Sequence, residues 1–181
     1  MIIEDDYKII LDKIAAEFPE FKIIAKDTSS LMKTIDVMLK IITFGQMNSF
    51  MLDFTTTLGT KIYTPSTWVD MPVEAKITIL RHELIHMRQA RRYGRFLFSF
   101  LYLIFPLPVV FAYYRAKFEK EAYEESLRAI HEYRGPKAFT SGLKSRVLSH
   151  FTTAQYFWMW PWKKGLSVWY DSVVDRIKSE K

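Results

Sequence analysis

Apolar side chains recur every three or four positions in several stretches of the chain, a spacing typical of amphipathic helices. The pattern predicts helices at residues 5–17, 29–43, 72–93, 109–133, 141–150 and 164–179. The expected end signals accompany them. Ser29 or Ser30 can cap the second helix, Gly94 follows the third, and Gly135 with Pro136 ends the fourth. The chain is therefore expected to be mainly helical.

Two other stretches have the composition of β-strands. Residues 21–25 are short and apolar. Residues 50–64 resemble a β-hairpin rich in Phe, Thr and Ile, with Leu58 and Gly59 at its turn. No linker or repeat separates the elements, so we expect one α+β domain over residues 1–181. It would be mainly helical, with a small antiparallel β-hairpin or sheet before the third helix.

Composition narrows the functional classes. The 181 residues are 49% hydrophobic and 25% charged, which suits a folded domain. There are no cysteines, which excludes disulfides and thiolate metal ligands and suits a reducing compartment. The N-terminus shows no secretory signal, so a cytoplasmic location is expected, either free or peripheral to a membrane. The net charge of +6 is modest and the basic residues form no long block, so no nucleic acid partner is expected.

A motif with metal-ligand spacing, His82-Glu83-Leu84-Ile85-His86, lies within the helix predicted at 72–93. Positions four apart share one helix face, so the imidazoles of His82 and His86 can bind one ion. Glu83 can reach a water molecule on that ion; zinc lowers the pKa of such a water, and the carboxylate takes its proton. This spacing is therefore typical of zinc hydrolases. The alternative is that these are ordinary helix residues, with Glu83 on a solvated face.

Catalytic zinc usually has three protein ligands and a water molecule, and an acidic segment further along the chain can supply the third. With the motif around His82 and His86, the run Glu119-Lys120-Glu121-Ala122 resembles the zincin metallopeptidases of the gluzincin type, whose second helix often reads Glu-x-Glu-Ala-Asp. The resemblance implies a zincin-like domain in which the first Glu of that run binds zinc. Tyr123 stands where the family has Asp, which makes Glu125 an alternative supporting carboxylate.

Helical phase separates Glu119 from Glu121. At about 100° per residue, an exposed face collects Lys117, Lys120, Glu124 and Arg128. The opposite face collects Arg115, Glu119, Ala122 and Ser126. Glu119 is therefore near the centre of the inner face and Glu121 toward its edge, which favours Glu119 as the ligand and leaves Glu121 as the alternative. A wholly solvated acidic face is a further interpretation.

Residues that stabilise the transition state are harder to identify. Zincin sites of this type use a Tyr or His to stabilise the oxyanion. The candidates are Tyr123, His131, His150 and Tyr156, each of which could instead be a packing residue. The hairpin at 50–64 could hold an extended peptide along a sheet edge, or serve structural pairing alone.

Two apolar and aromatic segments bear on partners. Residues 96–114 approach the length of a membrane span, about 20 residues, but Pro106 and Pro108 interrupt them. If Glu119 binds the same ion as His82 and His86, both ends of this segment lie on the same side of the membrane, which argues against a single crossing. Burial in the domain, a wedge in a membrane interface, and an apolar groove remain as interpretations. Residues 156–164, rich in Trp and ending in two lysines, resemble an interfacial anchor or ordinary core.

The sequence therefore predicts a zinc-dependent metallohydrolase, more narrowly a metallopeptidase acting on a peptide or protein substrate. Zn²⁺ would be held by His82, His86 and Glu119, with Glu83 as the general base. The alternative is a membrane-surface-associated or binding protein with a zincin fold and a structural or inactive metal site.

Overall fold

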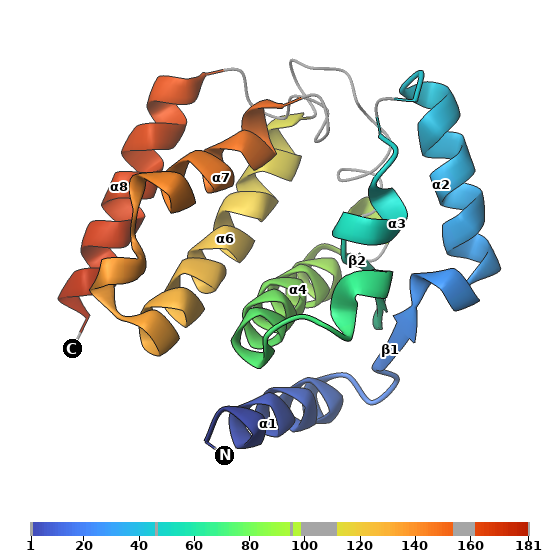
Figure 1. Ribbon diagram of the computed structural model, residues 1–181, viewed down its shortest axis with the longest axis horizontal. Helices are drawn as coiled ribbons and strands as arrows, with labels where there is room; N and C mark the ends of the chain where they lie inside the picture. The colour runs from blue at the N-terminus through green and yellow to red at the C-terminus, as the bar shows by residue number, and fades with distance from the viewer. Residues whose placement is uncertain (1, 46, 95, 99–111, 154–161, 181) are drawn as a thin grey trace. The chain divides into compact units, whose positions relative to one another are not determined.

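The computed structural model describes residues 2–45, 47–94, 96–98, 112–153 and 162–180 (Figure 1). The chain divides into two compact units, Met1–Met87 and Arg88–Lys181. Helices predominate and the described strands form one small sheet, so the predicted α+β class is confirmed. The single-domain organisation stays a prediction.

The first unit has nearly the predicted order of elements. They are α1 (Ile2–Glu17), β1 (Lys22–Ala25), α2 (Ser30–Ile42), α3 (Phe50–Asp53), β2 (Thr56–Leu58), β3 (Lys61–Thr64) and most of α4 (Val73–Tyr93). α1 buries Ile10 and Ile14 on one face, as its apolar spacing predicts. Ser29 caps α2 by accepting a hydrogen bond from the amide of Met32 at 3.3 Å. The predictions for α1, β1, α2 and α4 are confirmed.

β3 is the central strand of a three-stranded sheet with the order β1-β3-β2. β1 pairs with β3 in parallel, and β2 pairs with it in the antiparallel direction. Ile62 on β3 is fully buried, as expected for a central strand. The predicted antiparallel pairing is confirmed for β2 and β3, and the parallel β1 makes the sheet mixed. β2 lies at one edge of this sheet.

The prediction of a strand at the start of the 50–64 segment is wrong, because Phe50–Asp53 form the short helix α3. The carbonyl of Ser49 accepts the amides of Leu52 and Asp53 at 3.0 and 2.9 Å, which closes a helical turn. Phe50 is buried, and its carbonyl accepts a hydrogen bond from Lys26. Met51 and Leu52 are also good helix formers and Asp53 is unfavourable in strands, so local preference and these tertiary contacts both favour the helix.

The hairpin turn is also shifted by one residue from its predicted position. Leu58 pairs with Lys61 in the sheet, so the turn consists of Gly59 and Thr60. Gly59 adopts a φ of 64°, a left-handed conformation that glycine reaches without steric cost and that tight hairpin turns require.

α4 follows the sheet and carries the motif. It runs from Val73 to Tyr93 and ends at Gly94, whose φ is 83°. Its inner face buries Ile77, Leu80, Leu84 and Met87. These apolar residues lie at helical spacing, so the packing of this face sets the rotation of α4.

The second unit consists of helices. Its longest elements are the end of α4, α6 (Ala112–Arg134), α7 (Ser141–Thr152) and α8 (Lys163–Ser179). They confirm the helices predicted at 109–133, 141–150 and 164–179, except that residues 109–111 lie outside the described part of the chain. α6, α7 and α8 share a core in which Leu127, Phe151 and Leu166 are fully buried. Thr140 caps α7 by accepting the amide of Leu143 at 3.2 Å.

The polar face of α6 meets α8. Lys120 places its Nζ 5.7 Å from the Trp169 ring, and further along, Glu124 accepts from Arg176 at 2.7 Å. Arg128 then pairs with Glu180. The contacts advance in the same direction along both helices, so α6 and α8 run parallel. The prediction that this face is exposed to solvent is wrong in part, because Arg176 and Glu180 provide charges opposite to those of Glu124 and Arg128.

Much of segments 96–114 and 156–164 lies outside the described residues, which leave out 99–111 and 154–161. The burial, wedge and groove interpretations of 96–114, and the anchor interpretation of 156–164, therefore stay predictions. Among the helices that the structure describes, none is long and apolar enough to cross a membrane.

Candidate metal centre

α4 brings His82 and His86 together, as the motif predicts. Their Nε2 atoms lie 3.1 Å apart, and their rings meet edge to face with centroids 4.8 Å apart. Tetrahedral zinc with Zn–N bonds of about 2.0–2.1 Å separates two ligand nitrogens by about 3.3 Å. The observed separation therefore suits two nitrogen ligands of one ion.

Glu83 is held from the neighbouring sheet. Its carboxylate is buried, and its Oε2 accepts a hydrogen bond from the Thr57 hydroxyl at 2.7 Å. Thr57 belongs to the edge strand β2, so the first unit itself positions the predicted general base. Sequence reasoning missed Thr57. Its only signal was a β-forming composition, because a contact across 26 positions leaves no local pattern.

A buried lysine lies near the same carboxylate. Lys26 is fully buried; its Nζ donates to the Phe50 carbonyl at 2.8 Å and lies 3.5 Å from the centre of the Phe50 ring. Burial lowers the pKa of Lys26 to about 7, although the negative charges of Glu83 and Asp36 act in the opposite direction. The sequence contains no signal for this residue, which lies in a short polar stretch between β1 and α2.

The end of α4 packs against α6 within the second unit. Gln89 is buried, and its Nε2 donates to the Phe118 carbonyl at 3.1 Å and to Glu121 Oε2 at 2.8 Å. The rings of Tyr93 and Phe98 both lie 5.2 Å from the Phe118 ring. Glu119 follows Phe118 directly.

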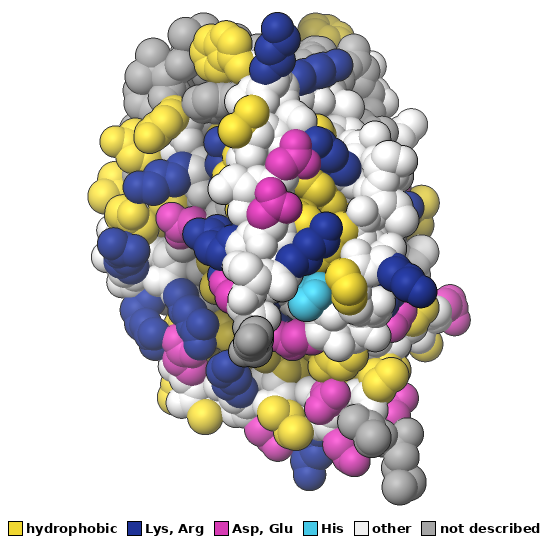
Figure 2. All heavy atoms as spheres, turned by 90° about the vertical axis from the view of Figure 1, so that its left-hand side faces the viewer, with side chains coloured by type: hydrophobic (Ala, Val, Ile, Leu, Met, Phe, Trp, Pro, Cys, Tyr) yellow, Lys and Arg dark blue, Asp and Glu magenta, His cyan; other side chains and the backbone are white. Residues whose placement is uncertain are grey.

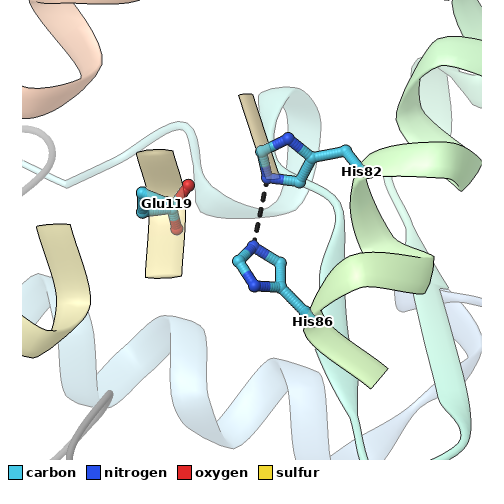
Figure 3. Close-up of side chains that lie close together, drawn as sticks. All are labelled: His82, His86 and Glu119. Carbon is cyan, nitrogen blue, oxygen red and sulfur yellow. Dashed lines mark hydrogen bonds between the residues drawn. The ribbon is translucent and has the colours of Figure 1, made fainter. Parts of the chain in front are cut away.

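Glu119 and Glu121 have different surroundings. Glu119 is buried, whereas Glu121 is exposed and bonded to Gln89. The ligand atoms of His82, His86 and Glu119 all lie within 4.8 Å of one another, and the group could hold a metal ion. Figure 3 shows the two imidazoles from α4 and the carboxylate of Glu119 from α6 facing a shared space. Two nitrogens and a carboxylate oxygen are a donor set that zinc accepts.

The four candidates for oxyanion stabilisation have different positions. Tyr123 lies one turn after Glu119 on α6, and its hydroxyl is hydrogen-bonded to Nδ1 of His150. His131 lies twelve residues beyond Glu119 on the same helix, about 18 Å along its axis, and stacks on Phe139. It is therefore too far from Glu119 to act at the same ion. Tyr156 is outside the described residues, and the supporting role of Glu125 stays a prediction.

Comparison of the chain with protein-family models, with curated proteins and with solved structures found no match. The resemblance to zincins consequently depends on the residues of the site alone.

Proposed function

We propose that this protein is a zinc-dependent metallohydrolase with a zincin-like site, and more narrowly a metallopeptidase. The observation that carries the proposal is the grouping of His82, His86 and Glu119 with ligand atoms within 4.8 Å of one another. Each residue comes from a motif position at which the resemblance to gluzincins calls for a zinc ligand. Glu119 is the preferred third ligand, because it is buried and belongs to this group, whereas Glu121 is exposed.

The chain's own residues have separable roles in this proposal. Zinc, when bound, would lower the pKa of a water molecule to about 7. Glu83 would accept the proton of the attacking water and then pass it to the leaving amine of the peptide. Thr57 donates to one carboxylate oxygen of Glu83, which leaves the other oxygen for this proton. β2 is a sheet edge, the kind of element that can pair with an extended peptide substrate.

Metal content is the first test. The purified wild-type protein should retain about one zinc per chain, and His86→Ala should lose it. Glu119→Gln should weaken zinc retention strongly, whereas Glu121→Gln should leave it near the wild-type value. A wild-type protein that binds no zinc even when zinc is supplied would overturn the proposal. Loss of zinc in Glu121→Gln but not in Glu119→Gln would transfer the third ligand to Glu121.

Activity is the second test, with a library of quenched fluorescent peptides as substrate. Glu83→Gln should keep its zinc and lose hydrolysis by about 10²-fold or more, since it removes the general base and leaves the ligands intact. Zinc binding without hydrolysis in the wild type, over a broad peptide library, would instead support a binding protein with an inactive metal site.

A further inference from the structure

α6 and α8 begin at the same end of the second unit. They run parallel, with Lys120 beside Trp169. Tyr113 precedes Lys120 by seven residues and Trp162 precedes Trp169 by the same number, so each lies about 10 Å back along its helix. The first residues of α6 and α8 therefore lie at about the same position along the two parallel helix axes.

Two further parts of the chain reach this end. Phe98 packs on Phe118, which lies six residues after the beginning of α6. Phe151, at the end of α7, has its ring centroid 5.6 Å from that of Trp169. The described residues on either side of 99–111 and of 154–161 thus lie at the same end of the unit, a juxtaposition that the sequence does not reveal.

Large apolar side chains are exposed at this end. Phe96 is 94% exposed and Trp162 is 58% exposed, and three more residues there are about half exposed. The set, called here the apolar end, is Phe96, Leu97, Tyr113, Tyr114 and Trp162. Single exposed apolar residues are common on soluble proteins, but a group of this kind marks an interaction surface.

Only basic charges accompany the apolar end in the sequence. No Asp or Glu occurs between Glu83 and Glu119, nor between Glu132 and Asp171. Basic residues close to the apolar end are Arg92, Arg115, Lys117, Lys163 and Lys164. On the face drawn in Figure 2, acidic and basic side chains are interspersed lower down, whereas basic and hydrophobic side chains lie together at the uppermost end, where α8 begins.

We propose that the apolar end docks on an anionic lipid surface. Trp and Tyr favour the boundary between headgroups and acyl chains, because their rings are apolar and their polar atoms stay hydrated. Lysines flanking them can extend their ammonium groups to lipid phosphates while their stems cover apolar surface. The basic residues that flank the apolar end in the sequence match an anionic bilayer. This inference goes beyond the hydrolase proposal and does not depend on the metal.

Co-sedimentation with lipid vesicles tests the proposal on the full chain. The wild-type protein should sediment with vesicles of phosphatidylcholine and phosphatidylglycerol, and much less with phosphatidylcholine alone. Binding should weaken in 0.5 M salt, because the attraction of basic side chains to the surface is screened within the Debye length. His86→Ala should bind vesicles like the wild type, which separates this result from the fate of the metal site.

Matched variants locate the surface. Phe96→Ser combined with Trp162→Ser should lower the vesicle partition coefficient about tenfold or more, whereas Phe44→Ser, at a position 95% exposed in the first unit, should not. Lys163→Gln with Lys164→Gln should reduce the preference for anionic vesicles. The same change at two exposed lysines of α1, Lys8 and Lys13, should have no such effect.

Each contrary outcome refutes the proposal. Failure of the wild type to bind either kind of vesicle would do so. An equal loss of binding in Phe44→Ser would show that the apolar end is not the docking surface. Concentration-dependent dimerisation without vesicle binding, abolished by the Phe96 and Trp162 substitutions, would assign the apolar end to contact between two copies of this chain.

Discussion

Replacing Lys26 by Met should change how the stability of the protein depends on pH. Lys26 is fully buried, and burial lowers its pKa from 10.5 to about 7. Each unit of such a shift corresponds to about 1.4 kcal/mol, so holding the charged form in the folded protein costs about 5 kcal/mol. Met keeps a side chain of similar length and removes the charge.

The direction in which stability changes with pH follows from the number of protons that the folded and unfolded chains bind. Between pH 7 and pH 10.5 the unfolded chain holds a proton on this lysine that the folded protein has released, so stability rises with pH. The free-energy cost of the buried charge is fully present below pH 7 and absent above pH 10.5. From pH 7 to 9 the free energy of unfolding of the wild type should gain about 2 kcal/mol from Lys26. The hydrogen bond to the Phe50 carbonyl, worth about 1 kcal/mol, is lost in the variant at every pH.

Lys26→Met should consequently be more stable than the wild type at pH 6, and this advantage should shrink by about 2 kcal/mol between pH 7 and 9. Urea unfolding followed by circular dichroism at several pH values, with a chelator present to remove metal linkage, measures the difference. Lys33→Met is the control, because Lys33 lies exposed on α2. Parallel pH dependences for the wild type and Lys26→Met would refute the reasoning, since they would show that folding does not lower the pKa of this lysine.

Two further substitutions test single contacts. Thr57→Val removes the hydrogen bond to Glu83 and should lower kcat/KM for peptide hydrolysis about tenfold or more, with zinc content unchanged. Thr57→Ser keeps the hydroxyl and should have the wild-type kcat/KM. Equal rates for Thr57→Val and the wild type would show that the contact does not position the base. Glu124→Ala breaks the pairs with Arg128 and Arg176, and these groups are partly exposed, so the loss of stability should be about 1 kcal/mol or less and should shrink in 1 M salt. Glu20→Ala, at an exposed position in the first unit, should leave the stability unchanged. A loss of stability in Glu124→Ala that does not change with salt would argue against an electrostatic contribution.

The elements with strong local signals could be read from the sequence. Apolar spacing, the cap at Ser29 and the glycine at position 94 determine α2 and α4, because helix hydrogen bonds join residues four apart. The pairing of His82 with His86 is local for the same reason. Helical phase also predicted Glu119 near the centre of the inner face of α6 and Glu121 toward its edge; Glu119 is buried and Glu121 is exposed.

Only the tertiary structure decided the contacts between distant segments. The short helix Phe50–Asp53 begins at a buried Phe50 that contacts Lys26, a residue 24 positions earlier in the chain. The contact of Thr57 with Glu83 and the parallel course of α6 and α8 arise where apolar faces pack and polar groups find partners. Such contacts depend on the joint packing of many side chains, for which no short-range spacing in a single sequence provides a signal.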